Sequence, residues 1–215
     1  MGTSVILFWT GIAVALGYLA LANRPESWWR SLVKTVPLAL FALTSWAAEA
    51  PAFLTLALLF SAVGDLALSR VGRMAFLYGL ASFAIAHLMF IMLFQSLGAA
   101  QLWEAFALAP APALIVMLIA LSSELWLAPY TGALRTPVRI YVALITLMGL
   151  AALALPGGYA VVAIGAGLFI LSDLILAIRL FRLPEGDART APAGWALWLF
   201  YVAGQALILH TIATL

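Results

Sequence analysis

Apolar residues fill the chain in eight long runs, separated by short polar stretches. The runs cover about residues 4–22, 33–48, 51–69, 74–95, 104–122, 137–155, 158–179 and 194–214. Most of them reach the ~20 residues that a helix needs to cross a bilayer. Pro37 is expected in the first turn of the second span, whereas Pro110 and Pro112 should kink the fifth. The pattern predicts an all-α polytopic membrane helix bundle with eight transmembrane helices, forming a single transmembrane domain over residues 1–215.

Composition supports lipid as the main solvent of this bundle. Hydrophobic residues make up 67% of the chain and charged residues only 8%, whereas a soluble domain is nearer half apolar and a quarter charged. The chain has no cysteine, which excludes disulfides, thiolate metal sites and a cysteine nucleophile. The net charge of +2 is small, and the basic residues are spread over several loops. We therefore expect membrane lipids and no nucleic acid as partners.

The basic residues predict the orientation of the bundle. With eight spans, all ten of them lie in or beside alternate loops, as expected for cytoplasmic loops. Both termini should therefore be non-cytoplasmic, in an inner or plasma membrane. If run 33–48 did not cross, Arg70 and Arg73 would lie on the opposite side from the earlier basic residues. The ten basic residues are Arg24, Arg30, Lys34, Arg70, Arg73, Arg135, Arg139, Arg179, Arg182 and Arg189.

Two of the spans resemble one another. LFSAVGDLALSR at 59–70 and LFILSDLILAIR at 168–179 each place an aspartate between a small residue and leucine. Both would run from the outer side to the cytoplasmic side. The spans that follow them, 74–95 and 194–214, also align weakly. A parallel four-plus-four internal duplication would explain this similarity between the two halves of the chain.

The two aspartates of these motifs are the leading candidates for chemistry. Asp65 and Asp173 lie five and six residues before Arg70 and Arg179, so they should be about 7–9 Å from the cytoplasmic ends of their helices. A carboxylate costs roughly 2.5–3.5 kcal/mol near the bilayer centre. We therefore expect both side chains to face the bundle interior and to have a function.

Other polar residues are expected at a similar depth. Lys34 and Tyr141 begin the second and sixth spans, and Arg139 lies beside Tyr141. If the aspartates serve only to clamp helices together, Lys34 or Arg139 would be their partner. Tyr201 and Gln205 are spaced i, i+4 and share one helix face, where they would otherwise serve as hydrogen-bonding contacts between helices.

The two histidines are weaker candidates. His87 should lie near mid-membrane, either in the site or as a hydrogen-bonded packing residue, and His210 near the outer end should be structural. The following residues are expected to converge in a cavity open to the cytoplasmic leaflet: Lys34, Asp65, Tyr141, Asp173 and Tyr201.

Two carboxylates in one apolar cavity favour acid–base chemistry, with one protonated as the acid and one ionised as the base. The residues alone leave open whether they catalyse a reaction or support proton-coupled binding of a lipid-like substrate. A small transporter or lipid-binding protein is therefore the alternative from another class. A metal-dependent lipid hydrolase is a further alternative, and its ligands would be Asp65, His87, Asp173 and perhaps His210.

The order of these motifs resembles the YhhN family of integral membrane proteins, whose animal relatives are the lysoplasmalogenases. The resemblance is carried by Lys34-x-x-Pro37, LFSAVGDLALSR, His87 in the next span, the Tyr141 span, and GLFILSDLILAI followed by Tyr201-x-x-x-Gln205. It implies hydrolysis of the vinyl ether bond of a lysoplasmalogen to a fatty aldehyde and glycerophosphoethanolamine or glycerophosphocholine.

The resemblance also implies roles for the candidate residues. Asp65 and Asp173 would share the acid and base roles, as paired carboxylates do in glycoside hydrolysis. Lys34 or Arg139 would hold the phosphate of a lysophospholipid substrate. The side chains expected to orient water or substrate are His87, Tyr141, Tyr201 and Gln205. This chemistry needs no metal and no cofactor.

Overall fold

The computed structural model describes residues 2–184 and 186–213, and all regular structure in these ranges is helical. Short 3-10 turns connect some of the helices. The α-helices are α1 (Thr3–Tyr18), α2 (Trp28–Ala47), α3 (Ala52–Leu68), α4 (Arg73–Ser96), α5 (Ala105–Leu108), α6 (Pro110–Trp126), α7 (Arg135–Leu153), α8 (Ala160–Phe181) and α9 (Thr190–Ile212). Because α5 is only one turn, the eight other helices correspond to the eight predicted runs. Residue 214, the last of the final run, lies outside the described residues.

In the described part of the chain, four helical stretches are long and apolar enough to cross a membrane. They are α4, α9 and the stretches Gly132–Leu153 and Gly157–Phe181, which contain α7 and α8. Helices α1, α3 and α6 are apolar but shorter. Large apolar side chains also cover the outside of the bundle, where Leu118 and Leu125 are 64% and 81% exposed. Such a surface is suited to lipid rather than to water.

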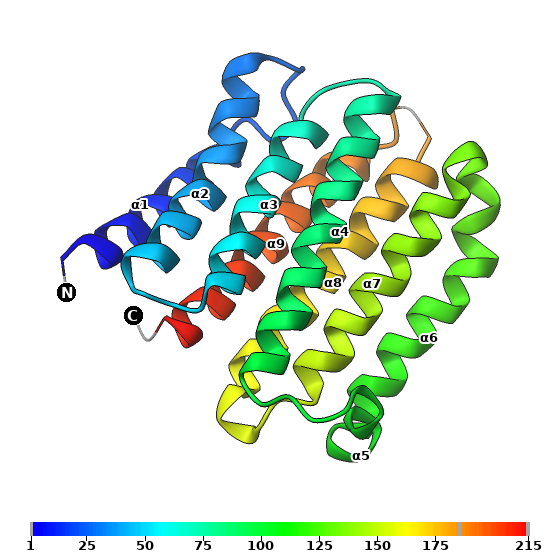
Figure 1. The fold of residues 1–215 in the computed structure, drawn as a ribbon. Helices are drawn as coiled ribbons and strands as arrows, with labels where there is room; N and C mark the ends of the chain where they lie inside the picture. The colour runs from blue at the N-terminus through cyan, green and yellow to red at the C-terminus, as the bar shows by residue number, and fades with distance from the viewer. Residues whose placement is uncertain (1, 185, 214–215) are drawn as a thin grey trace.

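The helices form two layers (Figure 1). Consecutive helices α1 to α4 pack side by side, α4 then packs on α7, and α6 lies outside α7. Helices α8 and α9 form a closely packed pair behind α3, α4 and α7. Helix α9 closes the bundle against α1, where Trp198 Nε1 donates a hydrogen bond to the Ala15 carbonyl at 2.8 Å. The start of α1 and the end of α9 lie at the same end of the bundle.

The prolines lie at other positions in their helices than the sequence predicts. Helix α2 begins at Trp28, five residues before the predicted run, so Pro37 lies inside the helix rather than in its first turn. Pro110 is the first residue of α6, after a break at Ala109, so the expected kink inside this span is wrong. Proline is well suited to a first helical position because its missing N–H has no intrahelical acceptor there.

Aromatic side chains from α4, α8 and α9 fill the centre of the bundle. The Phe169 ring lies 4.8 Å from His87, 5.4 Å from Tyr201 and 6.2 Å from Phe83, measured between ring centroids. Phe169 and Phe90 are fully buried. Since these rings pack beside polar groups, the core also forms one wall of the site described below.

A close backbone contact between α8 and α9 predicts that adding a side chain there lowers stability. A Cβ atom added to Gly204 would lie 2.6 Å from the Gly165 carbonyl oxygen. Gly204→Ala should therefore force the helices apart and cost about 1–3 kcal/mol, as overpacking does. Thermal unfolding of the purified protein in detergent measures this loss.

Gly167→Ala is the matched control, because a Cβ atom there meets nothing within 4 Å. This variant should unfold at or slightly above the wild-type temperature, since alanine favours helix over glycine by up to about 1 kcal/mol. Equal unfolding temperatures for the two variants would contradict this description of the α8–α9 contact.

Candidate functional site

Asp65 is enclosed by partners from two other helices. It lies in the last turn of α3 and is 2% exposed. Its Oδ1 atom is 2.9 Å from Lys34 Nζ of α2, and its Oδ2 atom accepts a hydrogen bond from the Tyr201 hydroxyl of α9 at 2.8 Å. The convergence expected for these three residues is therefore present in the structure. The ion pair and the hydrogen bond satisfy a carboxylate that would otherwise be costly to bury.

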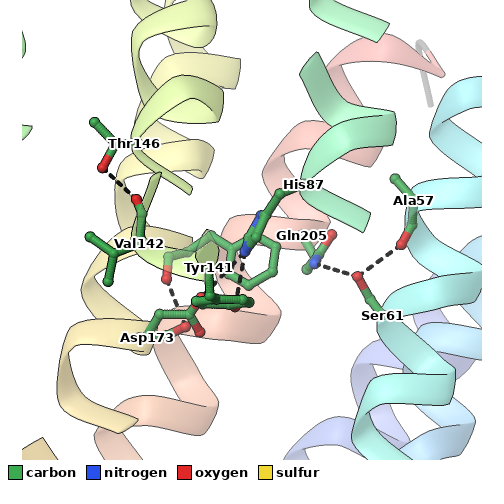
Figure 2. A network of polar contacts seen from close by, with 10 residues as sticks. Ala57, Ser61, His87, Tyr141, Val142, Thr146, Asp173 and Gln205 are labelled. Carbon is green, nitrogen blue, oxygen red and sulfur yellow. Dashed lines mark hydrogen bonds and ion pairs between the residues drawn. The ribbon is translucent and has the colours of Figure 1, made fainter. Parts of the chain in front are cut away.

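Asp173 has a second, separate set of partners (Figure 2). The Tyr141 hydroxyl of α7 donates to Asp173 Oδ2 at 2.5 Å. His87 Nε2 of α4 lies 2.9 Å from the Tyr141 oxygen and 3.5 Å from Asp173 Oδ2. The Asp173 side chain is 14% exposed, against 2% for Asp65, so it is the more accessible carboxyl group.

Gln205 and His87 each have an unsatisfied atom. Gln205 Nε2 donates to the Ser61 hydroxyl at 3.2 Å, which links α9 to α3 one turn from Tyr201 (Figure 2). Both His87 and Gln205 are fully buried, and His87 Nδ1 and Gln205 Oε1 have no partner among the described residues. Tyr201 and Gln205 therefore share an inward face, as the spacing predicts, and Gln205 also serves as a polar contact between helices.

A polar cavity gives access to both aspartates. It has a volume of about 1600 Å³, including its open mouth, and lies between α1, α2, α3, α4, α8 and α9. Lys34, Asp65, Asp173 and Tyr201 line it, as do several further basic residues. This arrangement suits a polar, anionic group bound beside the carboxylates.

An apolar slot approaches Asp173 from another side. Its empty space is about 850 Å³, including the open space at its mouth, and it is lined mainly by α4, α6, α7 and α8, including Val116, Ile145 and Ile170. Six residues border both the slot and the polar cavity: Leu68, Phe76, Phe83, Asp173, Leu176 and Leu180. Asp173 therefore lies where a polar cavity and an apolar slot meet.

A comparison of the whole chain agrees with this architecture. A model of the YhhN family matches residues 29–212. The chain belongs to the YhhN family. No solved structure matches the chain. Both aspartates and all of their partners lie inside the region that the family covers.

One candidate residue of this YhhN-family chain contacts neither set of partners around the two aspartates. Arg139 Nε and Nη2 donate to Glu124 Oε1 and Oε2 at 2.8 and 2.5 Å on the outer side of α6 and α7. The two side chains are about half exposed. Arg139 therefore contacts neither aspartate, and Lys34 is the cation that pairs with Asp65.

A metal-dependent site would need the histidines beside several carboxylates. Among the described residues, no group of three or more His, Asp and Glu side chains is placed to hold a metal ion. His210 packs against Phe8 of α1, with 5.8 Å between ring centroids. His87 and Asp173 are close together, but Asp65 is bound by Lys34 and Tyr201.

Sequence reasoning missed three basic residues that line the polar cavity, namely Arg30, Arg70 and Arg179. In the sequence they are indistinguishable from other arginines of the cytoplasmic loops, because the charge bias of these loops accounts for all of them. Their partial burial distinguishes them, since Arg24, Arg73 and Arg182 are exposed.

The ion pair between Lys34 and Asp65 predicts coupled effects on stability. Lys34→Met would leave a buried carboxylate without its cation, which costs about 3–5 kcal/mol when one partner of a buried pair is removed. The double variant Lys34→Met/Asp65→Asn should recover much of this loss, because asparagine needs no counter-charge. Thermal unfolding in detergent of the two single variants and the double variant tests this. Losses that simply add in the double variant would contradict the pairing.

Proposed function

We propose that this YhhN-family protein hydrolyses the vinyl ether bond of a lysoplasmalogen, releasing a fatty aldehyde and a glycerophospho-headgroup. The observation that carries the proposal is the position of Asp173 between the polar cavity and the apolar slot. A lysoplasmalogen has the same division, since its vinyl ether joins a polar headgroup to an apolar chain. The resemblance to the animal lysoplasmalogenases supports the same substrate class.

The proposal includes a membrane orientation. We place eight crossing helices, α1–α4 and α6–α9, in an inner or plasma membrane with both termini on the non-cytoplasmic side. The start of α1 and the end of α9 lie at one end of the bundle, which supports an even number of crossings between them. The charge bias of the alternate loops supports a cavity that opens toward the cytoplasmic leaflet, where a lysophospholipid would enter from the lipid.

Asp173 is the proposed general acid. Tyr141 occupies its Oδ2 atom, and among the described residues Oδ1 has no partner. A protonated Asp173 would transfer its proton to the β-carbon of the vinyl ether, converting the ether into an oxocarbenium ion. His87 and Tyr141 would hold the carboxyl group in the orientation that this transfer needs.

Asp65 is the proposed general base. The Lys34 ammonium beside it favours the ionised carboxylate, and negative charge in the same cavity stabilises the oxocarbenium ion. Water adds to the cationic carbon and gives one proton to Asp65. When the hemiacetal collapses, Asp65 protonates the departing glycerol oxygen and Asp173 takes the hemiacetal hydroxyl proton. Both carboxyl groups thus return to their starting states.

The partners of the two aspartates support the proposed four-plus-four duplication. Asp65 of α3 is bound by the preceding helix, α2, and by the last helix of the other half, α9. Asp173 of α8 contacts the preceding helix, α7, and the last helix of the other half, α4. The same relation in both halves is expected if they arose from one four-helix unit that pairs with its own copy.

Aldehyde release by the purified protein tests the reaction. Wild-type protein in detergent should release a fatty aldehyde from a lysoplasmalogen. Asp173→Asn should lower the rate by at least about 10²–10⁴-fold, the usual contribution of a general acid or base, and Asp65→Asn by a similar factor. Tyr141→Phe, which removes the hydrogen bond to Asp173, should reduce the rate less.

Glu124→Gln is the matched control for these variants. It removes one carboxylate from the exposed pair with Arg139 and should leave aldehyde release unchanged. If folded wild-type protein binds the lipid but releases no aldehyde, while a known lysoplasmalogenase does so in the same assay, the hydrolase proposal is wrong. A transporter or lipid-binding protein would then be the better account.

The apolar slot predicts a preference for chain length. Val116 and Ile170 both lie beside Gly149 and line the end of the slot farthest from Arg179 along α8. Val116→Phe should shorten the slot and raise KM for a long alkenyl chain by about tenfold, the effect of one or two displaced methylenes. Hydrolysis of a substrate with a chain several carbons shorter should be unchanged. An equal effect on both substrates would show that the chain binds elsewhere.

A further inference from the structure

The mouth of the polar cavity carries more positive than negative charge. Four basic side chains line it, namely Arg30, Lys34, Arg70 and Arg179. Lys34 is paired with Asp65. Arg70 lies 2.6 Å from Glu26, donates to Ser31 and stacks 4.0 Å over the Trp28 ring. Two guanidinium groups, those of Arg30 and Arg179, therefore remain without a carboxylate partner among the described residues.

Arg179 is the less satisfied of the two. It lies in the last turn of α8 and is half-buried, yet no described residue accepts a hydrogen bond from its side chain. A Cβ atom on Gly194 of α9 would lie 3.2 Å from Arg179 Nη1, so the guanidinium packs directly on the glycine backbone. Partial burial of a cation is costly without an acceptor, which points to a ligand that supplies one.

Arg30 is fixed in place but keeps a free donor. Its Nε and Nη2 atoms donate to the Leu21 and Ala22 carbonyls at 3.2 Å, just after the end of α1. Its Nη1 atom has no described acceptor. Arg30 and Arg179 line the same cavity, and two like charges in one cavity repel one another. An anion between them would replace this repulsion with two attractive contacts.

The described carboxylates at this end of the bundle do not supply that anion. Glu26 pairs with Arg70, Glu124 with Arg139 and Asp187 with Arg189. Glu185 lies outside the described residues. The two residues expected from the sequence to hold a phosphate, Lys34 and Arg139, are both engaged by carboxylates.

We infer that Arg30 and Arg179 form the subsite for the phosphodiester group of the lysophospholipid, an assignment that rests on the proposed function. Guanidinium groups bind phosphate oxygens in a bidentate manner. Arg179 follows Asp173 by six residues on α8, a rise of about 9 Å along the helix. An extended glycerol phosphate spans this separation, so the vinyl ether would reach Asp173 while the phosphate contacts Arg179.

Binding of a non-hydrolysable lipid tests the subsite without depending on catalysis. The probes are a 1-alkyl lysophospholipid, whose saturated ether cannot be cleaved by this route, and a 1-alkylglycerol with the same chain but no phosphate. Binding to the full-length protein in detergent is followed by tryptophan fluorescence, because Trp198 lines the cavity. Arg179→Gln should weaken binding of the lysophospholipid by about 10–100-fold, as the loss of a charge-assisted hydrogen bond does, and leave binding of the alkylglycerol unchanged.

Arg182→Gln is the matched control for charge. Arg182 directly follows α8, is exposed and stacks 3.8 Å over the Tyr130 ring outside the cavity. This variant should bind both lipids like the wild type. Arg179→Lys, which keeps the charge but loses the bidentate geometry, should weaken lysophospholipid binding to an intermediate degree and serves if the glutamine variant does not fold.

Three results would overturn the assignment. The first is wild-type affinity for the lysophospholipid in both Arg179 variants. The second is an equal loss of affinity for the alkylglycerol, which would indicate a purely structural role. The third is binding of inorganic phosphate that depends on Arg179 when binding of the lysophospholipid does not. This result would assign the site to free phosphate. Because aldehyde release is measured separately, failure of the hydrolase proposal would be distinguishable from each of these.

Discussion

Placing two carboxyl groups inside an apolar helix bundle is the constraint on which this structure depends. Neither aspartate has a partner on its own helix, so each must be satisfied from elsewhere. Asp65 connects α3 to α2 and α9, and Asp173 connects α8 to α7 and α4. Helices distant in the sequence are thereby held together. The same contacts that make burial of the carboxyl groups tolerable also assemble the candidate site.

Two residues of the same type acquire different properties from their surroundings. Asp65 is enclosed and has a lysine at 2.9 Å, whereas Asp173 is more exposed and contacts a tyrosine and a histidine. Of the two aspartates, only Asp173 borders both the polar cavity and the apolar slot. The proposed division into acid and base follows from this asymmetry, and the shape of the two spaces suits an amphiphile with its reactive bond at their junction.

Much of this arrangement could be predicted from the sequence, because the depth of a residue in the membrane follows from its distance along the helix to the nearest loop. Polar residues at one depth on inward faces are favoured to meet, and Lys34, Asp65 and Tyr201 do converge. The order of helices around the bundle is not readable in this way. The pairing of Arg139 with Glu124 and the separate sets of partners around the two aspartates therefore emerge only from the fold.

The most direct test of the central claim is the position of solvent hydrogen in the product. If Asp173 protonates the β-carbon of a vinyl ether, hydrolysis in deuterated water should place one deuterium on the carbon next to the aldehyde group. Trapping the aldehyde by immediate reduction and measuring its mass would give a shift of one deuterium per molecule at that carbon. Aldehyde released without this deuterium would contradict proton transfer to carbon, and with it the role assigned to Asp173.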